Sequence, residues 1–596
     1  MLQYESSFAG YFKFFYRVVG NRLLLSVTLS IVVSILDGVG LTMLMPLLQS
    51  VADGEASRES MGHLHYITDF ITALGFSLTL ETVLIIVGVV FALKGFVKFL
   101  ELSYQAKVLQ YFMKKVRHEL VYGLEKISFA GFTQLDAGNI QNNLIAEVQR
   151  MSNAGRNYLI YSQSLFMLIV YVIFATAANY QFAILVAISV GLTNILYSRF
   201  YKKMKEASYE ISKKGDNFNA FLIQAIHYFK YLKSTNYLSN YSRKLGSVID
   251  RTEHLNRKTA HYTAITTGMR EPMILLIVIA VIYVQINFMN ANLGSIILSL
   301  VLFYRALNFL VATQQNWQSF IQNTGSLRNV SMIYSMMKNR EERNGTIEFH
   351  TLQNEIQLQN VSISYGANKV LDQVSIRVPR SETIAFVGES GSGKTTLVNM
   401  LMGLIQPDSG TVLIDNTPLT KLRLETYRNK IGYISQDSVI FNDTIFNNIT
   451  FWADPTPEVY KRFWEVINMA SLKEFIESKP EKEFTKLGDN GILISGGQKQ
   501  RISIAREMFK KVEILVLDEA TSALDSETEL FIQENIEKLH GHFTIVVIAH
   551  RLSTIKNVDN IFLLENGRVV TSGDFYSMVT KSEKFKRMVS LQGLSL

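Results

Sequence analysis

The sequence contains no cysteine and few charged residues for its length. Without cysteine the chain has no disulfide bond, no thiolate metal site and no thiol nucleophile, so this feature does not indicate a redox compartment. Charged residues make up 18% of the 596 residues, against about 25% in an ordinary soluble protein. This shortfall lies almost wholly in the first half, which indicates a membrane half followed by a soluble half.

Uncharged segments in the first half predict six membrane-spanning helices, each needing about 20 residues. An aromatic-rich stretch, 1–22, precedes them without a cleavable signal-peptide pattern, and it is expected to form a helix in the inner interface. Apolar residues at helical spacing in 67–74 fit either a helix on the outer membrane surface or an ordinary loop helix. The spans are expected within 23–52, 80–101, 157–198 for a hairpin of two, and 272–311 for the last two.

Lysine and arginine gather in two long polar segments, 102–127 and 199–271, where the helical pattern continues beyond the expected spans. Basic residues favour the cytoplasmic side of a membrane, and the turns near 179 and 290 carry none, so both termini are expected in the cytoplasm. The formal net charge of +8 is explained by these segments, and no nucleic-acid partner is expected.

The second half reads as a soluble α/β domain. A charged, polar linker is expected at 339–355, with a nucleotide-binding domain at 356–596 after a membrane domain at 23–338. Strand-like runs alternate with helical ones in this second half, which is typical of a sheet covered by helices. The runs expected to form strands are 356–363, 370–378, 383–387, 514–517 and 544–548.

A glycine-rich loop between the apolar run 383–387 and a helical pattern predicts a phosphate-binding site. Glycines let backbone N–H groups point inward, and the following helix adds the positive end of its dipole. Lys394 is expected to reach the β and γ phosphates, and the Thr395 hydroxyl to bind Mg²⁺. The loop residues expected to bind nucleotide are Gly388, Ser390, Gly391, Ser392, Gly393, Lys394, Thr395 and Thr396.

A second part of the expected site is an apolar strand that ends in two carboxylates, Asp518 and Glu519. We expect Asp518 to hold Mg²⁺ and Glu519 to orient or deprotonate the attacking water. Such an acidic pair is common after a strand, so it indicates a nucleotide site only together with the phosphate-binding loop earlier in the chain.

The run Ile494-Ser495-Gly496-Gly497-Gln498, between the loop and the acidic pair, resembles the LSGGQ signature of ATP-binding cassette proteins, with Ile494 in place of leucine. The resemblance implies that Ser495, Gly497 and Gln498 face the ATP held by a partner subunit. It also assigns adenine stacking to Tyr365, contact with Mg²⁺ and water to Gln436, and a γ-phosphate contact to His550. Six spans and one cassette in a chain imply an exporter that works as a dimer; a homodimer is favoured because every catalytic position is present, and a heterodimer stays open.

Four charged residues in the expected spans give the evidence about the substrate. Asp37 and Arg305 lie near the expected bilayer middle, where charges usually face a cavity, and Lys94 and Lys98 lie nearer the inner interface. Basic groups beside lipid suit a substrate with a phosphate head and an apolar tail. With the helix at 67–74 and the pattern at 36–47, the chain resembles bacterial flippases for polyprenyl-diphosphate-linked oligosaccharides. The alternative pairs Arg305 with Asp37 structurally and directs both lysines to the interface.

Other functions remain open at this point. A multidrug or peptide exporter has the same architecture, although no N-terminal peptidase domain accompanies these spans. An ATP-gated channel or regulator is a different class, and Glu519 and His550 favour sustained hydrolysis instead. A soluble DNA-repair ATPase is excluded by the spans. The resemblance implies ATP and Mg²⁺ as ligands, lipid contact, and a bacterial inner-membrane location.

Overall fold

A computed structural model of the chain divides into two compact units, Met1–Ile127 with Gly131–Glu341, and Ser128–Ala130 with Glu342–Leu596. The structure describes residues 7–43, 73, 80–178, 180–269, 271–273, 275–276, 278–280, 283, 293–518, 540–549 and 551–592. The expected helix at 67–74 therefore lies almost wholly outside the described residues.

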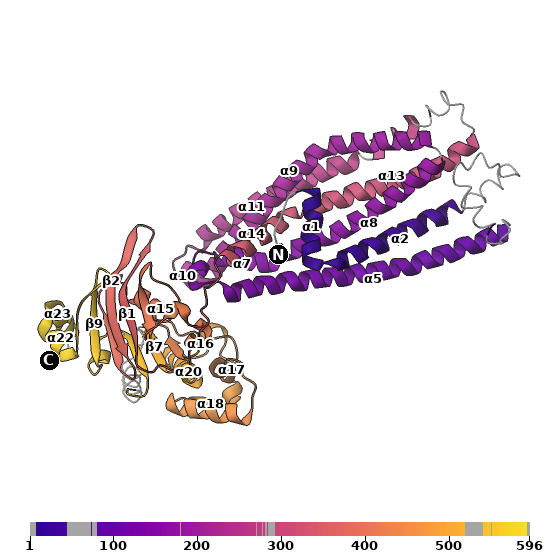
Figure 1. The fold of residues 1–596 in the computed structure, drawn as a ribbon. Helices are drawn as coiled ribbons and strands as arrows, with labels where there is room; N and C mark the ends of the chain where they lie inside the picture. The colour runs from indigo at the N-terminus through magenta and orange to yellow at the C-terminus, as the bar shows by residue number, and fades with distance from the viewer. Residues whose placement is uncertain are drawn as a thin grey trace. The chain divides into compact units, whose positions relative to one another are not determined.

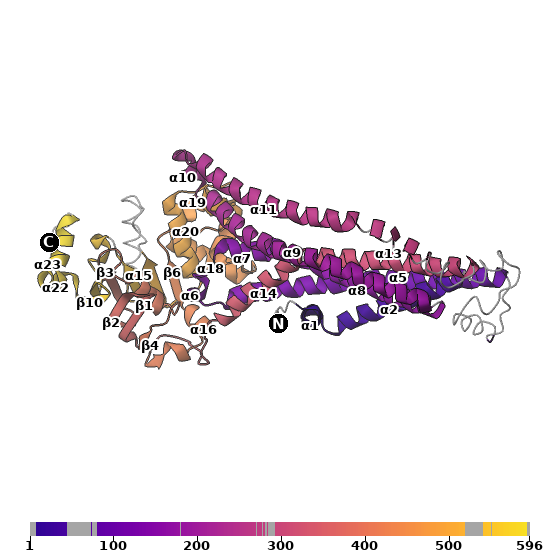
Figure 2. The same cartoon turned by 90° about the horizontal axis from the view of Figure 1, so that it is seen from above.

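The first unit consists of helices, several of them much longer than a membrane is thick. Long helices lie side by side along most of their length in both ribbon views (Figures 1 and 2). Helix α13 packs on α8, α2 packs on α5, and α11 packs on α9. The elements are α1 Phe8–Val19, α2 Asn21–Thr42, α5 Leu80–Lys126, α6 Phe129–Phe132, α7 Ala137–Asn142, a π-helix Asn143–Glu147, α8 Val148–Ala178, α9 Tyr180–His227, α10 Phe229–Ser234, α11 Leu238–Gly268, α13 Leu293–Ile321 and α14 Thr324–Asn339.

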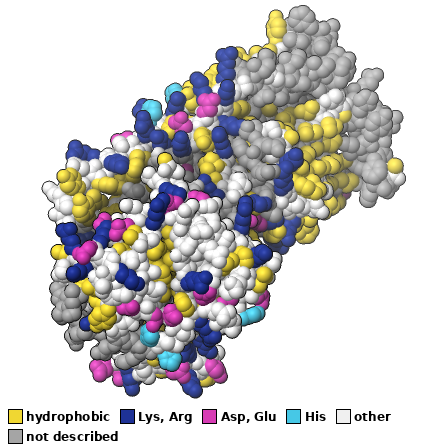
Figure 3. Space-filling view, turned by 60° about the vertical axis from the view of Figure 1, so that its left-hand side comes forward, with side chains coloured by type: hydrophobic (Ala, Val, Ile, Leu, Met, Phe, Trp, Pro, Cys, Tyr) yellow, Lys and Arg dark blue, Asp and Glu magenta, His cyan; other side chains and the backbone are white. Residues whose placement is uncertain are grey.

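Four helices among the described residues are long and apolar enough to cross a membrane: Asn21–Thr42, Glu81–Lys126, Ala137–Ala177 and Leu238–Ala280. The ranges expected for the fourth and sixth spans are helical as well, in α9 and α13. Helix α5 presents large apolar side chains such as Ile85, Val89 and Phe99 at its surface, as expected for a helix that contacts lipid. Apolar side chains also gather over one part of the surface in Figure 3, while most Lys and Arg side chains lie elsewhere.

Helix α1 is amphipathic and is fixed to the unit by its aromatic face. Tyr11, Phe14 and Phe15 are buried, and the Tyr11 ring meets that of Phe320 edge to face at 4.8 Å. The helix ends at Gly20, whose φ of +65° turns the chain into α2. The Lys115 ammonium donates to the Val18 carbonyl at 2.9 Å, which joins the end of α1 to α5.

The second unit contains two sheets with helices around them. The described strands form an antiparallel sheet in the order β2-β1-β4-β5 and a larger sheet in the order β10-β9-β3-β8-β7-β6. The strands are β1 Glu355–Tyr365, β2 Asn368–Pro379, β3 Thr383–Val387, β4 Ser409–Ile414, β5 Thr417–Pro418, β6 Ile431–Ile434, β7 Ile514–Asp518, β8 Thr544–Ile548, β9 Asn560–Glu565 and β10 Arg568–Gly573. The helices are α15 Lys394–Leu401, α16 Leu424–Arg428, α17 Ile445–Thr450, α18 Pro457–Met469, α19 Lys473–Glu477, α20 Gly496–Phe509, α22 Phe575–Lys581 and α23 Glu583–Leu591.

The central strands β3, β7 and β8 are buried at every residue, so the sheet is covered on both faces. This burial explains why these strands read as continuous apolar runs instead of alternating ones. Strands β3, β8, β7 and β6 are parallel neighbours, so their carboxyl ends lie along one edge of the sheet. Ligands of such sheets bind at that edge.

Candidate nucleotide site and charged groups of the membrane unit

The carboxyl edge of the larger sheet brings together three of the expected nucleotide-binding segments. In the strand register, Ile548 of β8 pairs with Phe386 of β3 on one side and with Asp518 of β7 on the other. The phosphate-binding loop begins directly after β3, and Gln436 follows the end of β6. The order of the strands therefore places the loop, Asp518 and Gln436 along the same edge.

The phosphate-binding loop has a backbone that requires glycine. Gly393 has a φ of +101°, and a Cβ atom there would lie 2.7 Å from Cδ2 of Leu371. A Cβ on Gly388 would lie 2.3 Å from the Leu564 carbonyl oxygen. Any side chain at these positions would displace the loop from the sheet.

The lysine of this loop is buried within it. Lys394, the first residue of α15, donates through Nζ to the carbonyl oxygens of Gly388 at 2.8 Å and Glu389 at 2.9 Å. The ammonium is thus held at the centre of the loop, where a phosphate chain would replace backbone carbonyls as its partner.

Unused polar groups around Lys394 fit a polyphosphate and its metal ion. The buried Ser392 hydroxyl has no hydrogen-bond partner among the described residues, and burying such a group without a partner is costly. Thr395 is exposed at the start of α15, beside the positive end of the helix dipole. Hydroxyl and carboxylate oxygens from Thr395 and Asp518 are hard ligands of the kind that Mg²⁺ prefers, and the bound ion would neutralise phosphate charge.

Asp518 has a neighbour that sequence reasoning missed. The Tyr433 hydroxyl on β6 donates to Oδ2 of Asp518 at 3.0 Å, and the carboxylate is largely buried. Burial, together with the charge of Asp518, raises the pKa of Tyr433, so the phenol stays a proton donor at neutral pH. The tyrosine therefore fixes the orientation of one oxygen of the carboxylate.

The signature segment forms the N-terminus of α20. The Ser495 hydroxyl accepts from the Gln498 backbone N–H at 3.3 Å, and Oε1 of Gln498 accepts from the Ser495 backbone N–H at 3.0 Å. This reciprocal pair is a capping box. Ser495 is exposed, as are Tyr365 at the end of β1 and Gln436 after β6, whereas Gly497 is buried. Two expected catalytic residues, Glu519 and His550, lie outside the described residues.

The charged residues of the spans form pairs that the sequence did not specify. Asp37 of α2 forms an ion pair with Lys94 of α5, and the Tyr171 hydroxyl of α8 donates to the other carboxylate oxygen at 3.0 Å. One prediction paired Asp37 with Arg305 instead, and it was wrong about the partner. Helical spacing gave the depth of each residue but not which helix lies beside α2.

A second pair lies one helical turn along α5. The Glu101 carboxylate is fully buried, accepts from Lys98 at 2.9 Å and Gln105 at 3.2 Å, and also accepts from the Ser30 hydroxyl of α2. Both lysines of the expected substrate cavity therefore have an acidic partner. Arg305 of α13 is exposed, and no hydrogen bond or ion pair joins it to the described residues.

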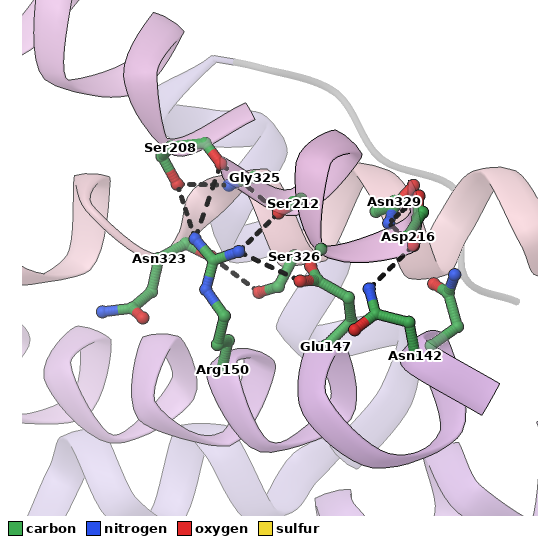
Figure 4. Close-up of polar contacts among 12 residues, drawn as sticks. Asn142, Glu147, Arg150, Ser208, Ser212, Asp216, Asn323, Gly325, Ser326 and Asn329 are labelled. Carbon is green, nitrogen blue, oxygen red and sulfur yellow. Dashed lines mark hydrogen bonds and ion pairs between the residues drawn. The ribbon is translucent and has the colours of Figure 1, made fainter. Parts of the chain in front are cut away.

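Outside the spans, a polar junction joins three helices of the membrane unit (Figure 4). The Arg150 guanidinium of α8 forms an ion pair with Glu147 at 3.0 Å and donates to the Ser212 hydroxyl at 2.6 Å and the Ser208 hydroxyl at 3.2 Å, both on α9. It also donates to the Gln322 carbonyl at 3.4 Å, which lies between α13 and α14. One arginine on α8 thus binds groups of α9 and of the connection between α13 and α14.

Asp216 lies in the same junction, surrounded by amides. Its carboxylate accepts from Nδ2 of Asn142 at 2.7 Å and from Nδ2 of Asn329 on α14 at 3.2 Å. Burial raises the pKa of Asp216 to about 6; the asparagine hydrogen bonds oppose this shift, and the nearby charges of Glu147 and Asp136 add to it. Sequence reasoning missed this junction, although Ser208, Ser212 and Asp216 recur every four residues on one face of α9.

Comparisons with known proteins agree with this architecture. Residues 24–310 match the family model of the ABC transporter transmembrane region, and residues 371–522 match that of the ABC transporter. An ATP-dependent lipid A-core flippase of Burkholderia thailandensis is 31% identical over 432 residues, which cover 70% of each chain. The chain therefore belongs to the ABC transporter family, and the predicted cassette and fused membrane domain are confirmed.

Within that family, two further proteins are similar along most of the chain. The heterocyst differentiation ATP-binding protein HepA of Nostoc sp. is 28% identical over 479 residues, covering 80% of this chain and 79% of that protein. The structure of a bacterial Atm1-family ABC exporter with ATP bound superposes with a TM-score of 0.78 at 20% identity, covering 96% of this chain and 99% of the other. The exporter fold is thus confirmed.

These findings define an integral membrane protein that binds and hydrolyses ATP to drive transport. One chain contains half of the transporter, so a second copy or a partner chain completes it.

Proposed function

We propose that two copies of this chain form an ATP-driven flippase for a lipid or a lipid-linked oligosaccharide in a bacterial inner membrane, with cytoplasmic termini. In this proposal 1–22 is the interfacial helix, 23–338 carries the substrate pathway, 339–355 is the linker, and 356–596 binds ATP. The relative at 31% identity is an ATP-dependent lipid A-core flippase, which supports a lipid substrate with phosphate and sugar.

The observation that carries the lipid proposal is the charge of Arg305. Lys94 and Lys98 each have an acidic partner, so most of their charge is already balanced. Arg305 lies in an apolar helix, is exposed, and forms no ion pair with the described residues; its charge acts only through space on Tyr171, which donates to Asp37. A guanidinium near the bilayer middle is costly unless it faces water or an anion. A phosphate-bearing lipid headgroup supplies that anion, and the planar fork of arginine suits it.

The proposed ATPase chemistry uses groups at the sheet edge and on α20. Lys394 binds the β and γ phosphates, Thr395, Asp518 and Gln436 hold Mg²⁺, and Tyr365 stacks on adenine. Glu519 acts as the base toward water, and His550 contacts the γ-phosphate. Across the dimer interface, Ser495, Gly497 and Gln498 of one copy face the nucleotide of the other, because a helix N-terminus attracts phosphate.

Reconstituted transport tests the substrate assignment. The wild type, Arg305→Gln and the control Arg257→Gln, which alters an exposed arginine on α11, are placed in liposomes. Each is assayed with a fluorescent polyprenyl-diphosphate sugar, a lipid A-type glycolipid, an ordinary phospholipid and an apolar dye. We expect Arg305→Gln to keep basal ATPase activity and lose flipping of the diphosphate lipids by about tenfold or more, from the loss of one charge-assisted contact. The control should match the wild type.

Other outcomes separate the alternatives. Movement of the dye alone would favour a multidrug exporter, and ATP-dependent ion conductance without any lipid movement would favour a gated channel. Equal flipping by Arg305→Gln and wild type would remove Arg305 from the substrate pathway. Glu519→Gln is expected to bind ATP and remain in a closed dimer without hydrolysis, and normal turnover in that variant would refute the assigned base.

A further inference from the structure

The cassette contains a buried arginine that forms no ion pair with a carboxylate of the described residues, although the charge of the neighbouring Glu507 acts on it through space. Arg506 of α20 is 4% exposed, and no ion pair joins it to the described residues. Its Nε donates to the Asn448 carbonyl at 2.6 Å, Nη1 to the Val439 carbonyl at 2.7 Å, and Nη2 to Oδ1 of Asn448 at 2.9 Å. The whole guanidinium fork is therefore used on neutral oxygen atoms.

These oxygen atoms belong to the segment that follows Gln436. Asn448, fully buried in α17, accepts from the Phe441 N–H at 2.8 Å and donates to the carbonyls of Phe441 at 2.9 Å and Thr444 at 3.0 Å. Arg506 and Asn448 together thus hold the backbone from 439 to 448. A single displacement of Arg506 would release both of its attachment points in this segment.

Aromatic rings complete the contact on the guanidinium faces. Cζ of Arg506 lies 5.2 Å from the Phe441 ring centroid and 5.4 Å from that of Phe451, within the range of cation–π attraction. Phe451 and Trp452 have φ values of +51° and +57°, which are unfavourable for bulky residues. Backbone strain of this kind persists only where the surroundings hold it in place.

Burying a cation is costly where no carboxylate forms an ion pair with it, and an apolar side chain of the same volume would avoid that cost. An apolar residue, however, would leave the carbonyls of Val439 and Asn448 without a donor and could not join α20 to the 439–448 segment. Arg506 therefore serves to join α20 to the 439–448 segment through several hydrogen bonds at once.

We propose that Arg506 is a positioning residue for ATP hydrolysis, which makes the helix capped by Ser495 and the segment that follows Gln436 move as one body. Ser495 faces the nucleotide of the partner copy and Gln436 faces that of its own, so the arginine couples the two sites within one cassette. The inference rests on the roles proposed above for Ser495 and Gln436.

The test compares full-length variants in nanodiscs. Arg506→Met keeps an unbranched side chain without donors, and Arg506→Lys keeps the charge but not the fork. Arg462→Met is the matched control, because Arg462 of α18 also donates to α20, to the Met508 carbonyl at 2.6 Å, while its hydrogen bonds among the described residues do not reach 439–448. The measured quantities are kcat and KM for ATP, binding of a non-hydrolysable ATP analogue, and the melting temperature.

We expect both Arg506 variants to lose kcat by about tenfold or more, the size of one lost charged hydrogen bond, with KM and analogue binding changed less than about threefold. Arg462→Met should lose melting temperature without a selective loss of kcat. Asn448→Ala should lower kcat as Arg506→Met does. The kcat of the double variant should lie within about twofold of the kcat of each single variant, because both residues act through one segment.

Three results with folded variants would overturn the inference. These are wild-type kcat in Arg506→Met, loss of kcat and analogue binding together, and multiplication of the two single effects in the double variant. Failure of both Arg506 variants to fold would assign the residue to stability alone and would also overturn it. Absence of ATP hydrolysis in the wild type would instead refute the ATPase roles on which the inference rests.

Discussion

The buried carboxylate of Asp216 predicts a pH-dependent stability that one substitution removes. Asp216 is 8% exposed, and its pKa is raised from 3.8 to about 6, first by burial. Between these two values the folded chain keeps a proton that the unfolded chain has lost. Stability is therefore present in full below about pH 4 and is lost as the pH rises through about 6.

The magnitude follows from the two pKa values. At about 1.4 kcal/mol per pKa unit, the difference between 3.8 and about 6 corresponds to about 3 kcal/mol. Asp216→Asn removes the charge while keeping the shape; the new amide oxygen can still accept from Asn142, and the amide of Asn329 can turn its oxygen atom toward the new NH₂ group. The variant should therefore be more stable than the wild type above about pH 7 by on the order of 1–3 kcal/mol, with little difference near pH 4.

Thermal melting of the purified full-length protein, followed by far-UV circular dichroism at about pH 4.5 and about pH 8, measures this difference. An energy of this size corresponds to a shift of a few degrees in a large domain. Asp250→Asn is the control, because it makes the same change of charge at an exposed position on α11. If Asp216→Asn and the wild type lose stability in parallel as the pH rises, the carboxylate does not carry the burial cost and the reasoning is refuted.

Three further predictions concern other contacts. Arg150→Met leaves Glu147 buried without its cation and should cost about 3–5 kcal/mol in melting experiments, most of it recovered when Glu147→Met is added; a loss below about 1 kcal/mol would contradict this. Tyr433→Phe removes the donor to Asp518 and should weaken Mn²⁺ binding to the nucleotide-loaded protein by about 10–100-fold in an electron paramagnetic resonance titration. Tyr427→Phe, which loses a bond to the Leu401 carbonyl, should leave that metal affinity unchanged. Gly393→Ala places a Cβ 2.7 Å from Leu371 and should abolish binding of a fluorescent ATP analogue, whereas Gly541→Ala, with no atom within 4 Å, should bind normally.

Much of the cassette could be predicted from the sequence because its central strands are buried on both faces. Each of the five expected runs corresponds to a strand, β1, β2, β3, β7 or β8, since continuous apolar segments between turn residues are a local signal. The strands β6, β9 and β10 and the antiparallel partners β4 and β5 were not anticipated. Strands β4 and β10 are partly exposed, and which strands become neighbours in a sheet depends on segments that are distant in the chain.

The arrangement of polar groups in the membrane unit could not be predicted in the same way. Helical periodicity gives the face on which Asp37 or Asp216 lies, but the partner depends on which helix packs against that face. Lys94 is the partner of Asp37 because α5 packs on α2, and Asn142 is a partner of Asp216 because α7 packs on α9. Motif residues such as Lys394 were predictable because the loop and its binding group are contiguous in sequence.

Two contacts between α2 and α5, the Asp37–Lys94 ion pair and the hydrogen bond from Ser30 to Glu101, limit how the transporter opens. Separating these helices would part Asp37 from Lys94, which costs at least about 2.5 kcal/mol for an unpaired charge in hydrocarbon, and would take Ser30 from Glu101, which keeps Lys98 on its own helix. The first two spans should therefore travel as a rigid pair during each cycle. A gap wide enough for a lipid headgroup must then form along a different boundary, where no charge has to leave its counter-ion.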